Sequence, residues 1–184
     1  MKRLLSLTAL GAIVAGAFLY VNETNPPWYE RLRYPLHYQQ YVRVHAQEHD
    51  LDPALLAAVI YQESKFDSGA RSSSGAVGLM QLTPKTAKGI AIRTGGQAFR
   101  TSDLYNPEIN IRYGAWYLDN LFKKYGSEKL VLAAYNAGQG NVDRWRAAHE
   151  GIQFSETRAY VDRVEDLKSI YRRAWRSQLY PASR

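Results

Sequence analysis

The sequence predicts an all-α fold, with a single helical domain preceded by an N-terminal hydrophobic helix. Apolar residues recur at helical spacing in successive segments, and a capping residue followed by proline marks the start of several of them. No segment shows the alternating, β-branched pattern of a strand. The length of 184 residues suits one domain with one sizeable core.

The composition narrows the possible functions. Apolar residues at 46% and charged residues at 22% are usual for a globular protein, and the lack of cysteine excludes disulfides, thiolate metal sites and a cysteine nucleophile. A net charge of +7 suits an anionic polymer, a membrane surface or a nucleic acid. The basic residues follow no nucleic-acid-binding motif and the histidines have no ligand spacing. We therefore expect no nucleic-acid partner, no metal and no cofactor.

Residues 1–21 have the features of a secretory signal or a membrane anchor. Lys2 and Arg3 precede an uncharged, apolar run from Leu4 to Val21, which reaches the lower end of the roughly 17–25 residues that span a bilayer. A small-residue cleavage pattern ends at Ala17, but the apolar run continues past it. We expect an uncleaved anchor, followed by a proline-containing linker over 22–34 and an exported domain over 35–176.

The first predicted helices of this domain are marked by proline and by capping residues at their starts. A helix is expected from Pro35 to about Glu48, and Asp52-Pro53 is a strong start for the next one. Thr83-Pro84 repeats this signal for a short helix that ends near Gly89. Residues 91–105 are expected to be irregular.

Three further helices complete the predicted domain. Asn106-Pro107 begins a long helix with one apolar stripe, which Gly126 closes. Ser127 is expected to cap the following helix, and a last helix starts at about Ser155. Residues 177–184 are expected to form a tail.

Glu63 is the candidate catalytic residue of the second helix. It follows Val59 and Ile60 by four and three residues, so its side chain falls on the apolar face. Burial and the C-terminal end of the helix dipole both disfavour its ionised form and raise its expected pKa. The alternative is a glutamate that pairs locally with Lys65 or Arg71.

Three motifs around these helices resemble the lytic transglycosylase (SLT) domain family. They are Glu63-Ser64, the run from Gly75 to Pro84 that reads GAVGLMQLTP, and Ala134 to Gly138, which reads AYNAG. The resemblance extends over roughly residues 38–167. It implies a lysozyme-like, mainly helical fold related to goose-type lysozyme.

The resemblance also implies roles for particular residues. Glu63 matches the single catalytic acid and base of the family, and Tyr160 matches a tyrosine that hydrogen-bonds it. The other matching positions are implied to bind substrate, and they are Ser72 (or its neighbours Ser73 and Ser74), Met80, Gln81, Tyr135 and Asn136. Packing alone is the alternative for Met80 and for the two tyrosines.

The implied activity is cleavage of the β-1,4 bond between N-acetylmuramic acid and N-acetylglucosamine in peptidoglycan, without water, to give 1,6-anhydro ends. Two alternatives stay open. One is a hydrolytic muramidase with a second carboxylate, for which Asp67 and Asp103 are candidates, and the other is a non-catalytic peptidoglycan-binding module. We expect a monomer in the bacterial cell envelope, on the exported side of the cytoplasmic membrane, bound to glycan strands and to the membrane through its N-terminal segment.

Overall fold

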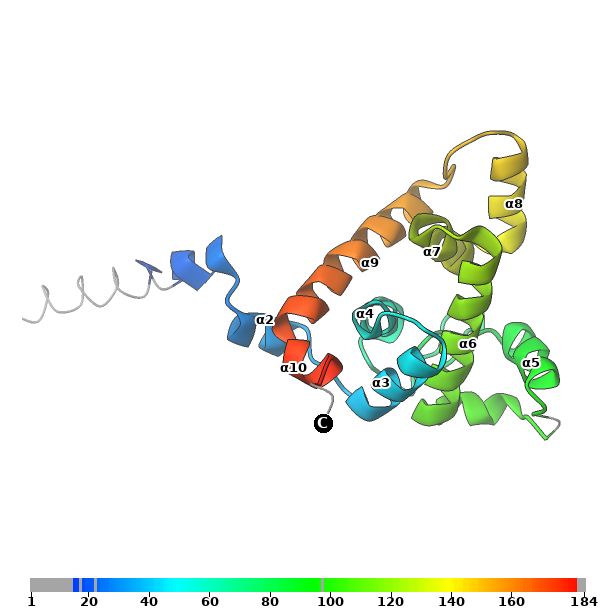
Figure 1. Cartoon of the computed structure of the whole chain (residues 1–184), viewed down its shortest axis with the longest axis horizontal. Helices are drawn as coiled ribbons and strands as arrows, with labels where there is room; N and C mark the ends of the chain where they lie inside the picture. The colour runs from blue at the N-terminus through cyan, green and yellow to red at the C-terminus, as the bar shows by residue number, and fades with distance from the viewer. Residues whose placement is uncertain (1–14, 17, 22, 97, 182–184) are drawn as a thin grey trace, which may run out of the picture. The chain divides into compact units, whose positions relative to one another are not determined.

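The computed structural model describes four stretches of the chain, residues 15–16, 18–21, 23–96 and 98–181. The chain divides into two compact units, Met1–Pro35 and Leu36–Arg184. The predicted all-α class is confirmed for the second unit, which is drawn from cyan to red in Figure 1. Its described residues contain only isolated β-bridges, which join Val77 to Arg71 and to Leu82.

The first unit contains a helix within the predicted linker. Helix α2 spans Pro27–Arg33, with Pro27 in its first turn, an acidic residue near its start and basic residues in its last turn. These are favourable positions for proline and for charges along a helix dipole. Most of the predicted anchor lies outside the described residues. Among the residues that are described, no helix is both long and apolar enough to cross a membrane.

The second unit is built around one buried helix, α4. Residues Ala54–Ile60 of α4 are all buried, and α4 packs mainly against α9 and α3. Figure 1 shows α4 end-on, with α9 on one side and α6 and α7 on the other. The helices of this unit are α3 (Gln39–Glu48), α4 (Pro53–Ser64), α5 (Pro84–Arg93), the 3-10 helix η1 (Thr101–Tyr105), α6 (Pro107–Tyr125), α7 (Glu128–Ala137), α8 (Gln139–Ala147), α9 (Ser155–Ala174) and α10 (Arg176–Leu179).

Most of the predicted helix caps are confirmed. The side chains of Asp52, Thr83 and Asn106 accept hydrogen bonds from backbone N–H groups in the first turns of α4, α5 and α6. Gly126 ends α6 in the left-handed conformation, as expected. The predicted cap at Ser127 is wrong, since its side chain makes no capping hydrogen bond to α7.

Several helix boundaries differ from the prediction. Helix α3 begins at Gln39 and not at Pro35, after a left-handed Tyr38. Helix α5 continues past Gly89 to Arg93, because Ile90 and Ala91 are buried and extend its apolar face. Helix α8 was not predicted at all, because only two of its nine residues are buried and its apolar signal is correspondingly weak.

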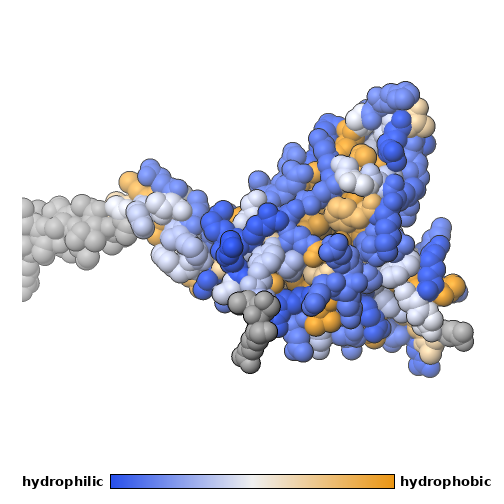
Figure 2. Space-filling model, viewed as in Figure 1, coloured by the Kyte–Doolittle hydropathy of each residue, from blue (hydrophilic) through white to orange (hydrophobic). Residues whose placement is uncertain are grey.

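The C-terminal residues add contacts to the start of α4. Leu179 of α10 is buried, and the Tyr180 hydroxyl donates a hydrogen bond to the carboxylate of Asp52. Arg172 of α9 forms an ion pair with the same carboxylate. Figure 2 shows a mainly hydrophilic surface along the outer side of α9, as expected for a helix with one buried face.

Gly114 of α6 provides a test of the packing. A Cβ atom there would lie 2.1 Å from the Sδ atom and 3.0 Å from the Cβ atom of Met80, which is fully buried. We expect Gly114→Ala to lower the free energy of unfolding by roughly 1–3 kcal/mol, because overpacking forces neighbours apart.

Urea unfolding followed by circular dichroism measures this change. Gly140→Ala is the matched control, since Gly140 also lies in a helix but a Cβ atom there meets nothing within 4 Å. The control should be neutral or slightly stabilising, because alanine favours helix over glycine. Equal stability of the two variants would contradict the close packing of α6 on Met80.

Candidate active site

Glu63 lies in the last turn of α4, and a residue distant in the sequence holds its side chain. The Tyr160 hydroxyl donates a hydrogen bond of 2.6 Å to Oε1 of Glu63. Tyr160 is buried in the first half of α9, which packs along α4. The bond predicted for this pair by the family resemblance is therefore present in the structure.

The environment of Glu63 raises the pKa of its carboxyl towards neutrality. Burial raises the pKa of Glu63 from 4.5 to about 7, although the hydrogen bond from Tyr160 favours the ionised form and lowers this pKa. The predicted rise is confirmed, with burial as the largest cause. Neither Lys65 nor Arg71 forms an ion pair with Glu63 in the described part of the chain, so the local-pairing alternative does not hold there.

The loop after α4 is shaped by its own hydrogen bonds. Ser72 is half-buried, and its hydroxyl accepts a hydrogen bond of 3.0 Å from the Ala76 N–H and lies 2.9 Å from the Ser74 hydroxyl. The Ser72 N–H also donates a hydrogen bond to the Ala76 carbonyl oxygen. These contacts fix a tight turn, with Ser72 at its base.

The amide of Gln81 closes the other side of this loop. Its Nε2 atom donates to the carbonyl oxygens of Gly78 at 2.9 Å and Ala70 at 3.2 Å. Gln81 itself has a left-handed backbone, with φ of 46°. The side chain therefore ties the start of the loop to its end, in addition to any contact with substrate.

Met80 contributes to the site through its backbone. Its side chain is fully buried against Gly114, so packing describes the role of that side chain in this structure. Its carbonyl oxygen accepts a hydrogen bond of 2.7 Å from the Tyr135 hydroxyl. The family resemblance implied a role for Met80 in binding substrate. In the structure, the main-chain carbonyl of Met80 orients Tyr135.

Asn110 of α6 was not predicted, yet it holds the loop in place. Its Oδ1 atom accepts from the Met80 N–H at 2.8 Å, and its Nδ2 atom donates to the carbonyl oxygens of Val77 and Leu104. Its side chain is completely buried. The sequence signal for this role is an amide four residues before Gly114 on the inward face of the helix.

Gly78 makes room for Asn110. The backbone of Gly78 has φ of +77°, and a Cβ atom there would lie 2.3 Å from Nδ2 of Asn110. Only glycine combines this conformation with such a close approach. The Gly-Leu-Met-Gln segment is therefore anchored from α6 as well as from its own loop.

Tyr135 and Asn136 link α7 to the rest of the site. The Tyr135 ring packs against the Tyr117 ring of α6, with centroids 5.5 Å apart. Burial, and next the negative charge of Glu63, raise the pKa of the Tyr135 hydroxyl well above its usual value. Asn136 is exposed, and its Oδ1 atom accepts a hydrogen bond of 2.7 Å from the Thr157 hydroxyl of α9.

The structure thus brings part of the predicted set together. The charge of Glu63 affects both Tyr135 and Tyr160 and raises the pKa of each. Within the described ranges, no hydrogen bond joins Ser72, Gln81 or Asn136 to the Glu63 carboxyl. These three side chains are bonded instead within the loop after α4 and to Thr157 of α9.

Comparison with known families decides the assignment. The model of the transglycosylase SLT domain matches residues 40–157, which include every site residue from Glu63 to Asn136. The chain belongs to the transglycosylase SLT domain family. Tyr160 lies just beyond the matched range, so its position rests on the geometry described above.

Curated relatives carry the same domain within longer chains. The chain is 34% identical to a soluble lytic murein transglycosylase of Salmonella typhimurium over 152 residues, which are 76% of this chain and 24% of the relative. It is 33% identical to the membrane-bound lytic murein transglycosylase F of Pseudomonas fluorescens, over 80% of this chain and 29% of the relative. The SLT chain therefore spans about a quarter of the length of these proteins.

Solved structures agree on the fold. The lytic transglycosylase Slt of Pseudomonas aeruginosa superposes with a TM-score of 0.73 at 36% identity, covering 80% of this chain and 26% of that chain. The soluble lytic transglycosylase of Escherichia coli gives a TM-score of 0.72 at 31% identity, covering 78% and 25%. The helical domain is therefore confirmed as similar to part of these transglycosylases.

The raised pKa of Glu63 predicts an effect on stability. Between pH 4.5 and 7 the folded state binds more protons than the unfolded chain, so the stability of the protein falls as the pH rises through this window. Gln at this position stays neutral and still accepts the Tyr160 hydrogen bond. We expect Glu63→Gln to stabilise the protein by roughly 1–3 kcal/mol at pH 8 and to have little effect at pH 4.

Urea unfolding at the two pH values measures this difference. Glu165→Gln is a suitable control, because Glu165 is exposed on α9, the helix that carries Tyr160. The control should show no comparable gain at pH 8. If Glu63→Gln changes the free energy of unfolding by the same amount at pH 8 and at pH 4, Glu63 ionises without lowering the stability of the folded state.

Proposed function

We propose that this SLT protein is a peptidoglycan lytic transglycosylase, with Glu63 as its general acid and then its general base. The observation that carries the proposal is the Glu63 carboxyl, which the Tyr160 hydroxyl holds at 2.6 Å and whose pKa, raised by burial to about 7, lets it give and take a proton near neutrality. Membership of the SLT family and similarity to relatives named as lytic murein transglycosylases support the same activity. The substrate is the glycan strand of peptidoglycan.

The first step of the proposed reaction is proton transfer. Neutral Glu63 donates its proton to the oxygen that links N-acetylmuramic acid to N-acetylglucosamine, and the bond from this oxygen to C1 of the muramic acid breaks. The N-acetyl oxygen of the muramic acid stabilises the positive charge that develops at C1. The hydrogen bond from Tyr160 to Oε1 stabilises the carboxylate that Glu63 becomes.

The second step regenerates the acid. The Glu63 carboxylate removes the proton of the 6-hydroxyl of the same muramic acid, and the 6-oxygen forms a bond to C1. A 1,6-anhydro ring closes, Glu63 is neutral again, and no water is consumed. A carboxyl with pKa near 7 suits both steps, because it is neither a weak donor nor a weak acceptor at neutral pH.

The remaining site residues are proposed to shape the sugar-binding wall. Tyr135 is oriented by the Met80 carbonyl and by Tyr117, so its ring is fixed before substrate arrives. Asn136 is exposed beside Tyr135 and is held by Thr157. Ser72 and Gln81 stabilise the loop and are the proposed polar contacts to substrate from the other side.

The candidate second carboxylates of a hydrolytic muramidase are engaged elsewhere. Asp67 accepts a hydrogen bond from the Gly69 N–H in an exposed turn, and Asp103 accepts one from the Arg100 N–H at the start of η1. Burial and Tyr160 are the causes of the shifted pKa of Glu63, and no other carboxylate of the described chain is among them. A two-carboxylate site places its acids within about 10 Å of each other. The lack of any influence of a second carboxylate on the Glu63 pKa within the described chain favours the one-carboxylate reaction.

The place of action is proposed from the N-terminal segment and the relatives. Similar proteins include both soluble and membrane-bound murein transglycosylases, which act on the cell envelope. We propose that residues 1–21 export the SLT domain and anchor it on the outer side of the cytoplasmic membrane. The domain would then act as a monomer on the strands within reach of its linker, residues 22–34.

Digestion of purified peptidoglycan by the full chain tests the activity. We expect muropeptides that are one water lighter than reducing muropeptides and that borohydride does not reduce, with mass spectrometry as the measurement. Glu63→Gln should lower their rate of release at least about 100-fold, because general acid–base catalysis is lost. Glu165→Gln, on the exposed face of α9, should keep the native rate.

Each other outcome rejects the proposal in a defined way. Reducing ends would identify a hydrolase and call for a second carboxylate. A folded chain that binds peptidoglycan without releasing products would be a binding module.

The Tyr160 hydrogen bond predicts a shift in the pH dependence of the rate. Because neutral Glu63 is the proton donor, kcat/KM should fall as the pH rises through about 7. Tyr160→Phe removes a bond that favours the ionised carboxyl, so the fall should move to higher pH by about one unit. Tyr41→Phe, on the exposed face of α3, should leave the profile unchanged. A shift of the Tyr160→Phe profile to lower pH would contradict the role given to the hydroxyl.

A further inference from the structure

Two histidines of α3 face α6, and the proposed reaction uses neither of them. His45 lies in the last turn of α3 and His49 ends the helix, so the two side chains share one face. Helix α3 packs against α6, and Figure 1 shows the two helices beside each other. His45 is only 4% exposed, which is unusual for a side chain that can carry charge.

Both ring nitrogens of His45 face carboxylates. Nδ1 lies 2.7 Å from Oε2 of Glu48 on the same helix, and Nε2 lies 3.4 Å from Oε1 of Glu108 on α6. A carboxylate only accepts hydrogen bonds, and a neutral imidazole carries a proton on one nitrogen only. The geometry therefore fits the imidazolium form, which can donate to both carboxylates.

His49 makes a second contact of this kind with α6. Its Nδ1 atom lies 3.2 Å from Oδ2 of Asp119, and both side chains are mostly buried. Lys123 also pairs with Asp119, at 2.7 Å, and Arg112 pairs with Glu108, at 3.3 Å. The other helices packed on α3, which are α4 and α10, contribute no ion pair to either imidazole in the described part of the chain.

The histidine-bound residues of α6 lie opposite two residues that shape the site. Asn110 follows Glu108 by two residues and Tyr117 precedes Asp119 by two, which is about 200° around the helix in each case. Asn110 holds the Gly-Leu-Met-Gln segment, and the Tyr117 ring packs against Tyr135. A shift of α6 relative to α3 would therefore move both of these supports.

We propose that His45, as an imidazolium, is a positioning residue that holds α6 against α3 and thereby fixes the loop and the aromatic rings of the site. His49 supports the same helix about three turns further along, at Asp119. The effect on catalysis rests on the proposed function. When His45 loses its proton, one of its two carboxylate contacts loses its donor, so the site is held more firmly in acidic than in alkaline medium.

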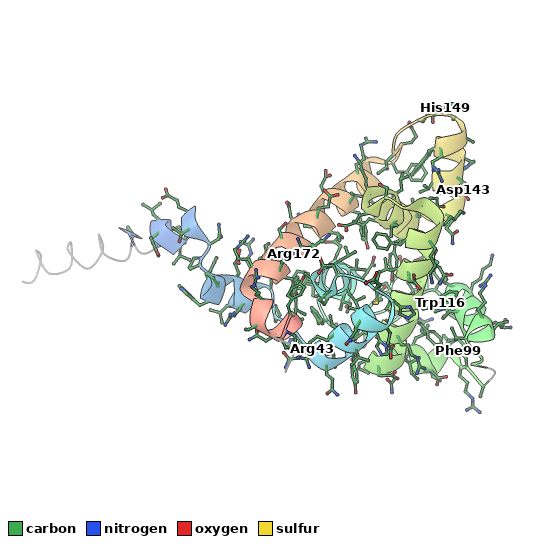
Figure 3. The ribbon with its side chains drawn as sticks, viewed as in Figure 1. Arg43, Phe99, Trp116, Asp143, His149 and Arg172 are labelled. Carbon is green, nitrogen blue, oxygen red and sulfur yellow. The ribbon has the colours of Figure 1, made fainter. Side chains whose placement is uncertain are left out.

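Nitrogen NMR of the native full chain in a nonionic detergent tests the charge of His45 without any turnover. We expect protons on both ring nitrogens at about pH 5.5 and on one nitrogen at about pH 8, on either side of the range in which imidazoles ordinarily titrate. His149, which is exposed in the loop after α8, supplies the reference signal (Figure 3). A single protonated nitrogen of His45 at about pH 5.5 would overturn the proposal.

The variant His45→Gln tests whether the contact reaches the site, because glutamine keeps an amide donor but has no charge. Neither Met80 nor Asn110 is bonded to His45 in the described chain. At about pH 5.5, we expect the backbone amide signal of Met80 and the side-chain amide signals of Asn110 to shift. His149→Gln is the matched control, since Figure 3 places His149 at the opposite end of the view from α3, and it should leave these signals unchanged. Unshifted signals in His45→Gln would overturn the proposal.

The release of anhydro products tests the effect on catalysis. At about pH 5.5, we expect His45→Gln and Glu108→Gln each to lower kcat about fivefold with little change in KM, because the site is misaligned and not blocked. The double variant should be no slower than either single variant, since all three break the same contact. At about pH 8, the loss caused by His45→Gln should be smaller, and His149→Gln should keep the native rate at both pH values.

The assays are run well below the thermal unfolding midpoint of each variant, so that loss of folded protein does not contribute. Multiplied losses in the double variant, or an equal loss by His45→Gln at both pH values, would overturn the positioning role. A native chain that yields no anhydro products would reject the proposed function. It would leave the NMR results on the charge of His45 and on its coupling to Asn110 valid.

Discussion

The hydrogen bond between Tyr160 and Glu63 joins α9 to α4 and holds the carboxyl on which the proposed chemistry depends. At the other end of α4, Asp52 is bonded to Arg172 and Tyr180. Eleven residues separate Asp52 from Glu63 and twelve separate Tyr160 from Arg172, so the two antiparallel helices have nearly equal lengths between their clamps, about 17 Å at 1.5 Å per residue. The position of the Glu63 carboxyl is therefore set by contacts at both ends of a buried helix.

The Glu63 carboxyl lies where its ionised form lowers the stability of the folded protein. Ionised Glu63 is disfavoured by burial, and the single hydroxyl of Tyr160 offsets only part of that effect. The surrounding structure must hold the site without help from this residue. Asn110 does so with three buried hydrogen bonds, two to the loop at Val77 and Met80 and one to Leu104 of η1, all contributed by a helix that does not carry Glu63. Asn110 thus stabilises the site, whereas Glu63 is the proposed acid and base.

The sequence predicted what local patterns determine. Asp52, Thr83 and Asn106 cap helices because their side chains precede proline and meet backbone N–H groups of the next turn, which requires no tertiary structure. Helix α8 could not be predicted in this way, because few of its residues are buried and their burial depends on packing against α7. Glu63 was found from its place on an apolar face, whereas the roles of Asn110 and of the Met80 carbonyl depend on contacts between distant segments.

With one carboxyl acting as both acid and base, the proposed reaction depends mainly on how the protein positions its substrate. In the proposed reaction the acceptor hydroxyl and the N-acetyl oxygen both belong to the substrate, so the protein would have to hold the muramic acid with both groups near C1. The rings of Tyr117 and Tyr135, which pack together before substrate arrives, are the proposed means of limiting the orientation of that sugar.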